Sequence, residues 1–301
     1  MRTPQQLHIP VLLSEVLTSL NPGPGESYLD LTTGYGGHAR EILTRTQAPE
    51  RATLVDRDQT AIDYLSGLDL GARLLHSDFR SAAVKLAADG ETFDLILLDL
   101  GVSSPQLDNA ARGFSFRLGG DLDMRMDQTS GRSAADLVNH SSEKTLAKII
   151  RDYGEETAGR ATLIARAIMH HRPIKTTTQL AEIVAQTIGR RGKIHPATRT
   201  FQALRIAVND ELGQLEKTLQ ILPKILAPGG RLAVISFHSL EDRIVKNFLR
   251  DAGQGLDSPL QILTKKPIVP TENEIDNNPR SRSAKLRAAV KINRKGLGRA
   301  N

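Results

Sequence analysis

The chain has 301 residues, of which 39% are hydrophobic and 25% charged, which is typical of a globular protein with a sizeable core. The absence of cysteine excludes a disulfide framework and thiolate metal sites, and we predict no metal site; without an apolar leader or an apolar run of roughly 18 residues, we expect a cytoplasmic protein that binds no membrane. The formal net charge of +6 favours a polyanionic partner such as nucleic acid, with simple solubility as the alternative.

The first third of the chain alternates short apolar runs with helical patterns. The helical patterns cover residues 37–46 and 59–65. The apolar runs, which we expect to be strands, are Tyr28–Leu31, Thr53–Val55, Arg73–His76 and Phe93–Leu100. Such alternation predicts a parallel sheet with crossover helices, and the continuous apolar stretch at 95–98 is typical of a buried central strand.

The strand pattern then stops and is replaced by a helical one. Residues 106–140 show little periodicity, and residues 141–212 look helical. One predicted helix face consists of Phe201, Leu204, Val208, Leu212 and Leu215. Strand patterns resume after the turn signal Pro228-Gly229-Gly230, at 231–237, 260–264 and 286–292. We predict an α/β sheet domain over 1–107 and 213–301, interrupted by an inserted all-helical, substrate-recognition domain over 108–212.

Glycines and acids gather where the predicted strands end. The first strand is followed by the turn Thr33–Ala39, which contains Gly34, Gly36 and Gly37. Acids close the successive strands at Asp30, Asp56, Asp78 and Asp99. Because ligands of open parallel sheets bind beyond the carboxyl ends of the strands, these residues predict a ligand site. The alternative is that each acid merely caps a helix or a turn.

These residues suit a nucleoside-containing cofactor. Glycines allow positive φ and close ligand approach, and Asp56 suits a contact with two ribose hydroxyls. Asp78 or Phe79 would flank an adenine ring. The turn also fits a dinucleotide fingerprint, so an oxidoreductase that uses a nicotinamide cofactor is the alternative. An acid at the fourth strand, Asp99, followed by a dense polar loop favours a methyltransferase.

Several longer motifs then identify a family. They are Glu15-Val16-Leu17, Leu98–Asp108, Arg112–Phe116, Leu122–Asp127, Tyr153–Glu156, Arg199–Ile206 with Asn209, Glu211 and Leu212, Ser236–Arg243 and Arg280–Arg287. Together they resemble the bacterial 16S ribosomal RNA (cytosine-N4)-methyltransferase family, and the resemblance runs from about residue 8 to 292. Small departures, at Ala39 and Asp121, fall on positions to which we assign no chemistry.

The resemblance implies a class I S-adenosylmethionine-dependent methyltransferase fold, Rossmann-like, with an inserted helical domain. It implies transfer from S-adenosyl-L-methionine to N4 of a cytidine in the decoding region of 16S rRNA, in the small ribosomal subunit. The family's cofactor contacts fall on Gly36, Gly37, His38, Asp56, Phe79, Asp99 and Gln106. A homodimer is one open option, and an assembly factor that retains the fold without catalysis is the non-enzymatic alternative.

The group that assists the amine is less clearly marked. An acceptor for the N–H of the cytosine amine would favour attack, and Asp99 with the loop Ser103-Ser104-Pro105 is the candidate. Asp99 serving only the cofactor is the alternative. His238, which follows the fifth strand in the sequence, is a second catalytic candidate that would orient the base, with a structural histidine as the alternative.

Target cytidines must leave their stack to be methylated. Phe114 and Phe116 would either hold the base by stacking or belong to the core. Three basic clusters are candidates for phosphate contacts: Arg112, Arg117, Arg125 and Arg132; Arg190-Arg191-Gly192-Lys193; and Arg280, Arg282, Lys285 and Arg287.

Overall fold

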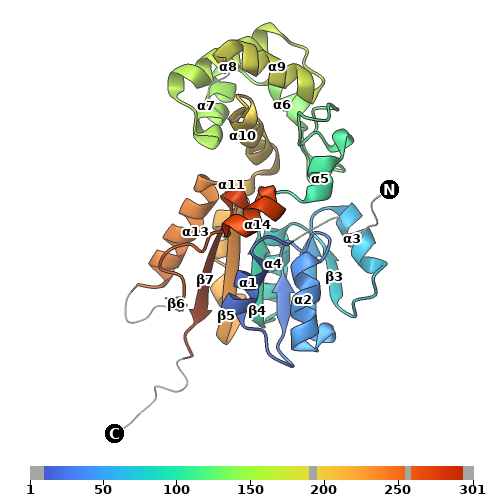
Figure 1. Ribbon diagram of the computed structural model, residues 1–301, viewed down its shortest axis with the longest axis vertical. Helices are drawn as coiled ribbons and strands as arrows, with labels where there is room; N and C mark the ends of the chain where they lie inside the picture. The colour runs from blue at the N-terminus through green and yellow to red at the C-terminus, as the bar shows by residue number, and fades with distance from the viewer. Residues whose placement is uncertain (1–9, 190–194, 255–258, 294–301) are drawn as a thin grey trace. The chain divides into compact units, whose positions relative to one another are not determined.

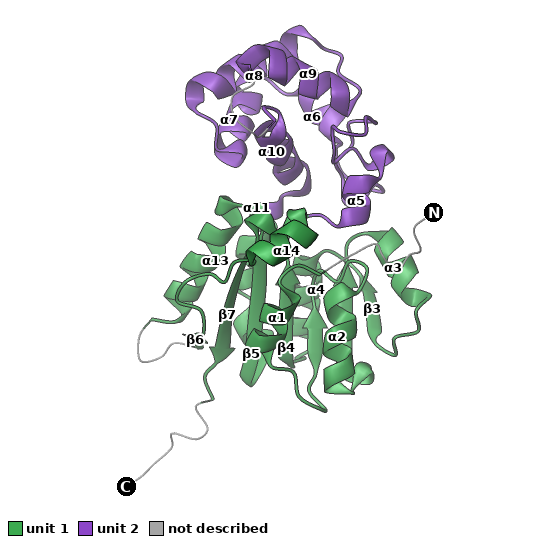
Figure 2. Cartoon of the chain, viewed as in Figure 1, with its two compact units in different colours: residues 1–101, 212–301 green, residues 102–211 purple. Residues whose placement is uncertain are grey.

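The computed structural model describes residues 10–189, 195–254 and 259–293. The chain divides into two compact units, coloured separately in Figure 2: unit 1 is Met1–Gly101 with Leu212–Asn301, and unit 2 is Val102–Glu211. The sequence placed the boundaries of two domains at 107/108 and 212/213. The division into two domains at those boundaries stays a prediction.

Unit 1 is built on a seven-stranded sheet with the order β3-β2-β1-β4-β5-β7-β6 (Figure 1). Neighbouring strands are parallel except β7, which pairs antiparallel with both β5 and β6. The strands are β1 (Tyr28–Asp30), β2 (Ala52–Asp56), β3 (Arg73–His76), β4 (Phe93–Asp99), β5 (Leu226–Ser236), β6 (Leu260–Ile262) and β7 (Lys285–Lys291). All seven predicted strands are present, and the predicted α/β sheet is confirmed.

Helices cover both faces of this sheet. Successive side chains of a strand point to opposite faces, so Ile96 and Leu98 pack in one buried cluster while Leu95 and Leu97 pack in another. The helices of unit 1 are α1 (Leu13–Leu20), α2 (Gly37–Thr46), α3 (Gln59–Ser66), α4 (Phe79–Ala88), α12 (Leu222–Ile225), α13 (Ser239–Ala252) and α14 (Glu272–Asn277), with 3-10 turns η2 (Pro49–Arg51) and η4 (Pro279–Ser283). Helices α1 and α2 contribute to the second cluster, and α4, α12 and α13 to the first.

Unit 2 is helical, as the sequence predicted for the segment between the fourth and fifth strands. Its elements are α5 (Ser104–Asp108), η3 (Ala110–Arg112), α6 (Ala134–His140), α7 (Glu143–Gly154), α8 (Ala158–His170), α9 (Thr177–Ile188) and α10 (Thr198–Asn209). One apolar cluster, which includes Leu146, Ile164, Leu180 and Leu204, forms its core. Within the described residues, no helix has the length and apolar character needed to cross a membrane.

Two local predictions were wrong. The face predicted as one helix over 201–215 belongs to two helices, because Asp210 adopts a left-handed conformation with φ of 48° and ends α10 before α11 (Glu211–Leu219) begins. The turn signal at Pro228-Gly229-Gly230 lies inside β5. There the pairing register with β4 shifts, from Phe93 opposite Leu226 to Leu95 opposite Arg231. The extra residues form an irregularity in the strand rather than a turn before it.

Candidate cofactor site

The glycine turn between β1 and α2 is shaped by two different constraints. Gly36 has a φ of +78° and is the N-cap of α2, and a Cβ there would lie 2.9 Å from Leu65 Cδ2. Gly37 begins the helix, and a Cβ there would lie 2.8 Å from Pro10 Cγ. The left-handed conformation therefore explains Gly36, whereas packing against Pro10 explains Gly37. No side chain caps α2, which leaves first-turn N–H groups for a ligand.

Asp56, at the end of β2, is tied to this turn. Its Oδ2 accepts a hydrogen bond of 2.7 Å from the Gly34 N–H, and its Oδ1 accepts one of 2.8 Å from the Asp58 N–H. Burial raises the pKa of Asp56 to about 6, and the two backbone hydrogen bonds oppose that rise. The structure thus gives Asp56 a role in holding the turn. A carboxylate has about four acceptor positions, so Asp56 can still accept from a hydroxyl donor in addition to these backbone groups.

His38, in the first turn of α2, and Asp99, at the end of β4, lie close together. The distance from His38 Nε2 to Asp99 Oδ2 is 3.6 Å, and the side chains are only 7% and 18% exposed. Among the described residues, neither ring nitrogen of His38 has a hydrogen-bond partner, and Asp99 Oδ1 has none either. Buried polar atoms are normally paired, so three unpaired atoms in one place mark a site that a ligand would complete.

Asp30, at the end of β1, belongs to the same cluster; the sequence marked it as a strand-end acid, although it is not among the cofactor contacts that the family resemblance implies. Its Oδ2 accepts a 2.7 Å hydrogen bond from the Tyr28 hydroxyl, and its Oδ1 accepts one of 3.1 Å from the Thr32 N–H. Burial raises the pKa of Asp30 to about 6 and that of Tyr28 well above its usual value, and the charge of Asp99 adds to both shifts. Its position at a strand end was the available signal.

The sequence left open whether Asp78 or Phe79 would flank an adenine ring, and the structure gives the two residues different environments. Asp78 is the N-cap of α4, and its Oδ1 accepts hydrogen bonds from the N–H groups of Arg80 and Ser81. Phe79 is the first residue of α4, is partly buried and packs against the apolar cluster on one face of the sheet. Asp78 is therefore engaged as a cap, while Phe79 keeps part of its ring exposed.

The last two candidates are both used in helix capping. Gln106, in unit 2, forms a capping box with Ser103, since its Oε1 accepts from the Ser103 N–H at 3.0 Å. His238, in unit 1, is the N-cap of α13, and its Nδ1 accepts from the Glu241 N–H at 3.3 Å. Because Nδ1 accepts, the proton of a neutral ring is on Nε2, which lies 3.2 Å from Glu241 Oε1.

The aromatic residues proposed to hold the base are engaged in unit 2. Phe114 is 7% exposed and belongs to the core. Phe116 packs against that core, with its ring centroid 4.6 Å from that of His195 and 4.9 Å from that of Phe201. The structure thus favours the core alternative for both phenylalanines.

The basic clusters are only partly exposed. In the first, Arg112 is buried and donates to the Met126 carbonyl at 2.7 Å, while Arg125 pairs with Asp123 at 2.8 Å. Arg117 and Arg132 are exposed. The second cluster, at 190–193, lies outside the described residues.

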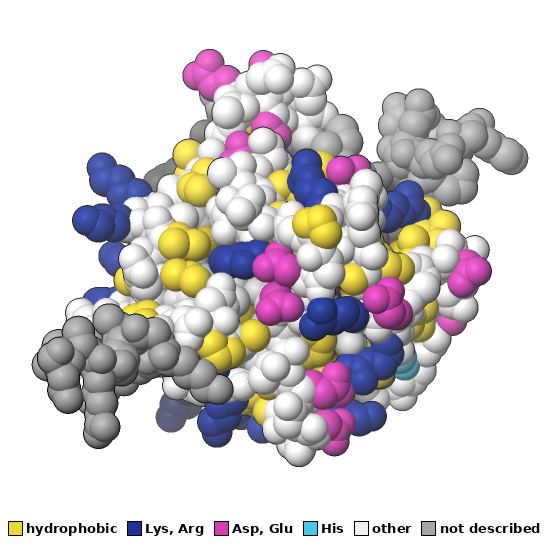
Figure 3. Space-filling view, turned by 90° about the horizontal axis from the view of Figure 1, so that it is seen from below, with side chains coloured by type: hydrophobic (Ala, Val, Ile, Leu, Met, Phe, Trp, Pro, Cys, Tyr) yellow, Lys and Arg dark blue, Asp and Glu magenta, His cyan; other side chains and the backbone are white. Residues whose placement is uncertain are grey.

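In the third cluster, Lys285 and Arg287 both pair with Asp242. Asp242 binds Arg287 Nε at 2.6 Å and Lys285 Nζ at 3.2 Å, and these pairs hold the pKa of its carboxyl below the usual value against the effect of burial. Arg280 and Arg282 are exposed. On the face shown in Figure 3, basic and acidic side chains are interspersed, so the net positive charge is not gathered there.

Comparisons with known proteins identify relatives along almost the whole chain. A family model described as the MraW methylase family matches residues 5–292. The chain is 52% identical over 298 residues to "Ribosomal RNA small subunit methyltransferase H" of Cyanothece sp., covering 96% of each chain. It is 52% identical over 293 residues to the protein of that name from Nostoc sp., covering 94% of this chain and 92% of the relative. Among solved structures, a putative rRNA-methylase from Clostridium thermocellum is 12% identical, with a TM-score of 0.46 and coverage of 95% and 100%.

Proposed function

The chain belongs to the MraW methylase family, and we propose that it transfers a methyl group to N4 of a cytidine in the decoding region of 16S rRNA. Family membership confirms the family resemblance, the class of enzyme, the methyl donor S-adenosyl-L-methionine and the class I fold. The names of the relatives, which specify small-subunit ribosomal RNA, support the substrate. The cytidine, its N4 atom and the decoding region rest on the motifs.

One observation supports the location of the donor site above all others. His38 and Asp99 hold three buried polar atoms that have no hydrogen-bond partner in the described part of the chain, at the carboxyl ends of the parallel strands β1 and β4. S-adenosylmethionine carries an ammonium, a carboxylate, a sulfonium and ribose hydroxyls, which offer both donors and acceptors to such atoms. The residues present therefore fit the cofactor.

We assign the contacts by the geometry of each residue. Asp56 would accept from the ribose hydroxyls while it holds the turn, and the N–H groups at the start of α2, at Gly37 and His38, would bind the carboxylate. Phe79 would contact the adenine ring. Gln106 stays a predicted contact that the family motif supports.

When bound, the cofactor supplies an electrophilic methyl group on a sulfonium. We propose that Oδ1 of Asp99 accepts a hydrogen bond from an N–H of the cytosine amine. This contact would direct the lone pair of the amine nitrogen toward that methyl group. Alignment of two reactants is worth about 7–11 kcal/mol in favourable cases, so no strong base is required. His238 stays the second candidate, and its use as a helix cap favours a role in positioning α13.

The partner that we propose is the small ribosomal subunit or its rRNA, and we propose a cytoplasmic location because ribosomal subunits are found there. The homodimer stays a prediction. Arg117, Arg132, Arg280 and Arg282 are exposed members of the basic clusters, and we propose that they contact phosphates.

The proposed function is tested by incubating small subunits from a strain that lacks this enzyme with labelled S-adenosylmethionine, followed by nucleoside mass analysis. We expect N4-methylated cytidine with the wild-type chain and a large loss with Asp99→Ala. Absence of that nucleoside with the wild type would overturn the assignment. Binding of a nicotinamide cofactor in calorimetry would support the oxidoreductase alternative, and RNA binding without methyl transfer would support the assembly factor.

A further inference from the structure

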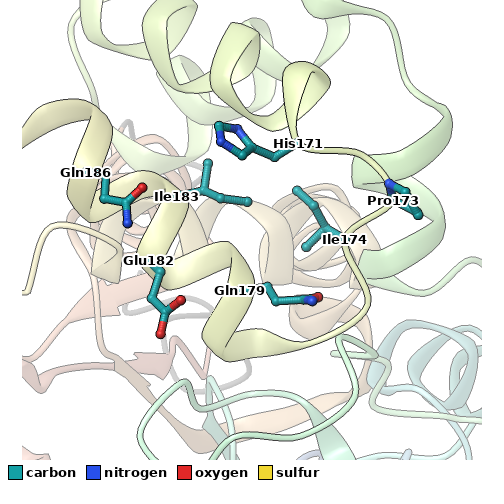
Figure 4. Close-up of a pocket in the computed structure, with 7 residues that line it drawn as sticks. All are labelled: His171, Pro173, Ile174, Gln179, Glu182, Ile183 and Gln186. Carbon is teal, nitrogen blue, oxygen red and sulfur yellow. The ribbon is translucent and has the colours of Figure 1, made fainter.

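Unit 2 contains a pocket that neither the motifs nor the proposed cofactor site uses. It has a volume of about 240 Å³ and lies between α9 and the segment that follows α8 (Figure 4). Its lining residues are His171, Pro173, Ile174, Gln179, Glu182, Ile183 and Gln186. Four of them, at positions 179, 182, 183 and 186, recur at the spacing of one helix face, so α9 forms a continuous wall.

Two polar side chains of the pocket have their hydrogen-bonding roles determined by the backbone. His171 Nδ1 lies 2.8 Å from the Ala167 carbonyl, which only accepts, so Nδ1 carries the proton and Nε2 of the neutral ring is an acceptor. Gln179 Oε1 accepts from the N–H groups of Lys175 and Thr176 at 2.9 and 3.1 Å. The amide orientation is therefore set, and its NH₂ group remains a donor.

The other polar lining residues add an acceptor and an adaptable amide. Glu182 and Gln186 are exposed and make no hydrogen bond within the described part of the chain. Ile174 and Ile183 are buried and provide apolar surface between the polar groups (Figure 4). The pocket thus has two buried isoleucines in its lining, and its donors and acceptors at the edge are the groups that would recognise a ligand.

We propose that this pocket binds one unstacked nucleobase that carries an exocyclic amine, at a point of the RNA other than the methylated cytidine. The proposal rests on the proposed function, because that function supplies the RNA. The volume is below the roughly 300 Å³ at which sites for drug-sized ligands begin, which suits a single base.

The charge of the pocket selects the base over other parts of the RNA. The Glu182 carboxylate disfavours a phosphate in the pocket and accepts from an amino group, as carboxylates do with the cytosine N4 amine. The Gln179 NH₂ group would donate to a ring nitrogen or carbonyl of the same base. Lys175 follows Ile174 in the chain and is exposed, so a cation for the adjoining phosphate lies on the same segment. Uracil lacks the amine and is the base that this arrangement rejects.

The experiment uses the full-length ¹⁵N-labelled chain, saturated with S-adenosylhomocysteine so that the cofactor site is filled. Cytidine 5′-monophosphate and uridine 5′-monophosphate are titrated while the side-chain amide signals of Gln179 and Gln186 are followed. We expect both signals to shift with the cytidine nucleotide and to require about tenfold more uridine nucleotide. Glu182→Gln should weaken the response to the cytidine nucleotide about tenfold.

Glu143→Gln is the matched control. Glu143 is also an exposed carboxylate of unit 2, is paired with Arg166, and does not line the pocket, so its substitution should leave the titration unchanged. Unmoved Gln179 and Gln186 signals, or equal responses of the wild type and Glu182→Gln, would overturn the proposal. Methyl transfer to small subunits is measured separately. Transfer without a signal shift removes only the pocket, whereas a shift without transfer removes only the proposed function.

Discussion

The polar motif residues of the two units differ in how they are paired. At the strand ends of unit 1, His38 and Asp99 are buried with unpaired atoms. In unit 2, several groups of the charged loop over 112–126 instead pair with each other or with the backbone. Arg125 binds Asp123 at 2.8 Å, and Asn209 binds the Met126 N–H at 2.9 Å and the Met124 carbonyl at 2.8 Å.

This difference teaches that a dense polar motif in a sequence has two distinct meanings. A motif whose side chains satisfy one another stabilises a loop that has no regular hydrogen bonding of its own. A motif that leaves buried atoms unpaired costs stability in the free protein and reserves those atoms for a ligand. Substitutions at the unpaired atoms of unit 1 should therefore lower cofactor affinity more than stability. Substitutions in the paired loop of unit 2 should lower stability more than cofactor affinity.

The largest effect is expected at Gly113 in unit 2. Its φ is +72°, and a Cβ would lie 2.4 Å from the Asp121 carbonyl oxygen and 2.5 Å from the Asp123 nitrogen. Gly113→Ala should lower the free energy of unfolding by about 4 kcal/mol, through left-handed strain and a backbone clash. Denaturant unfolding measures it. Gly131→Ala is the control: Gly131 also has a positive φ, of +78°, but a Cβ there would meet no atom of the described residues within 4 Å, so a loss of about 1 kcal/mol is expected.

A pH dependence of stability should distinguish unit 1. The folded pKa of Asp30 is about 6, against 3.8 in the unfolded chain, so the folded state binds more protons between these values. Asp30 should therefore contribute a fall in stability of roughly 3 kcal/mol as pH rises from about 4 to about 6, and Asp56, whose pKa is also raised to about 6, should add a similar fall over the same range. Denaturant unfolding across this range, compared with Asp30→Asn, checks it. An unchanged slope in the variant would contradict the assignment to Asp30.

Asn209 tests the pairing in unit 2. It is 2% exposed, and Asn209→Leu would leave the Met126 N–H and the Met124 carbonyl without their partner. We expect a loss of about 2 kcal/mol in unfolding free energy, with S-adenosylmethionine affinity unchanged in calorimetry. Weakened cofactor binding at full stability would be the opposite of this expectation.

The smallest change in stability is expected at His38. Both ring nitrogens are buried and have no hydrogen-bond partner among the residues that the structure describes. His38→Leu therefore removes a desolvated ring and should leave the free chain as stable as the wild type, or more stable by about 1 kcal/mol. Cofactor affinity should nevertheless fall about tenfold or more. A variant that is destabilised while binding the cofactor normally would show that the ring serves the fold.

Much of unit 1 followed from local patterns. The helix predicted at 37–46 coincides with α2, and the strand predicted at 73–76 coincides with β3. The division between α10 and α11 was missed, because the apolar spacing continues through Asp210 while the backbone does not. The sequence also predicted a turn at Pro228-Gly229-Gly230, where the structure has an irregularity within β5. Glycine and proline mark a departure from regular pairing without saying whether the strand ends.

Within the candidate site, the sequence predicted where the residues lie but not which groups they bind. The acids at Asp30, Asp56 and Asp99 follow parallel strands, whose carboxyl ends share one edge of the sheet, so their proximity was contained in the sequence. Two other features depended on packing between distant segments: Asp56 holds the Gly34 N–H, and Gly37 makes room for Pro10.

The sequence by itself determined the family, the donor and the edge of the sheet at which the donor site is expected, because motifs and hydrophobic periodicity are properties of neighbouring residues. Only the tertiary structure decided which polar groups are already paired. Pairing depends on atoms brought within about 3 Å from positions far apart in the chain, and no spacing along the sequence records that distance.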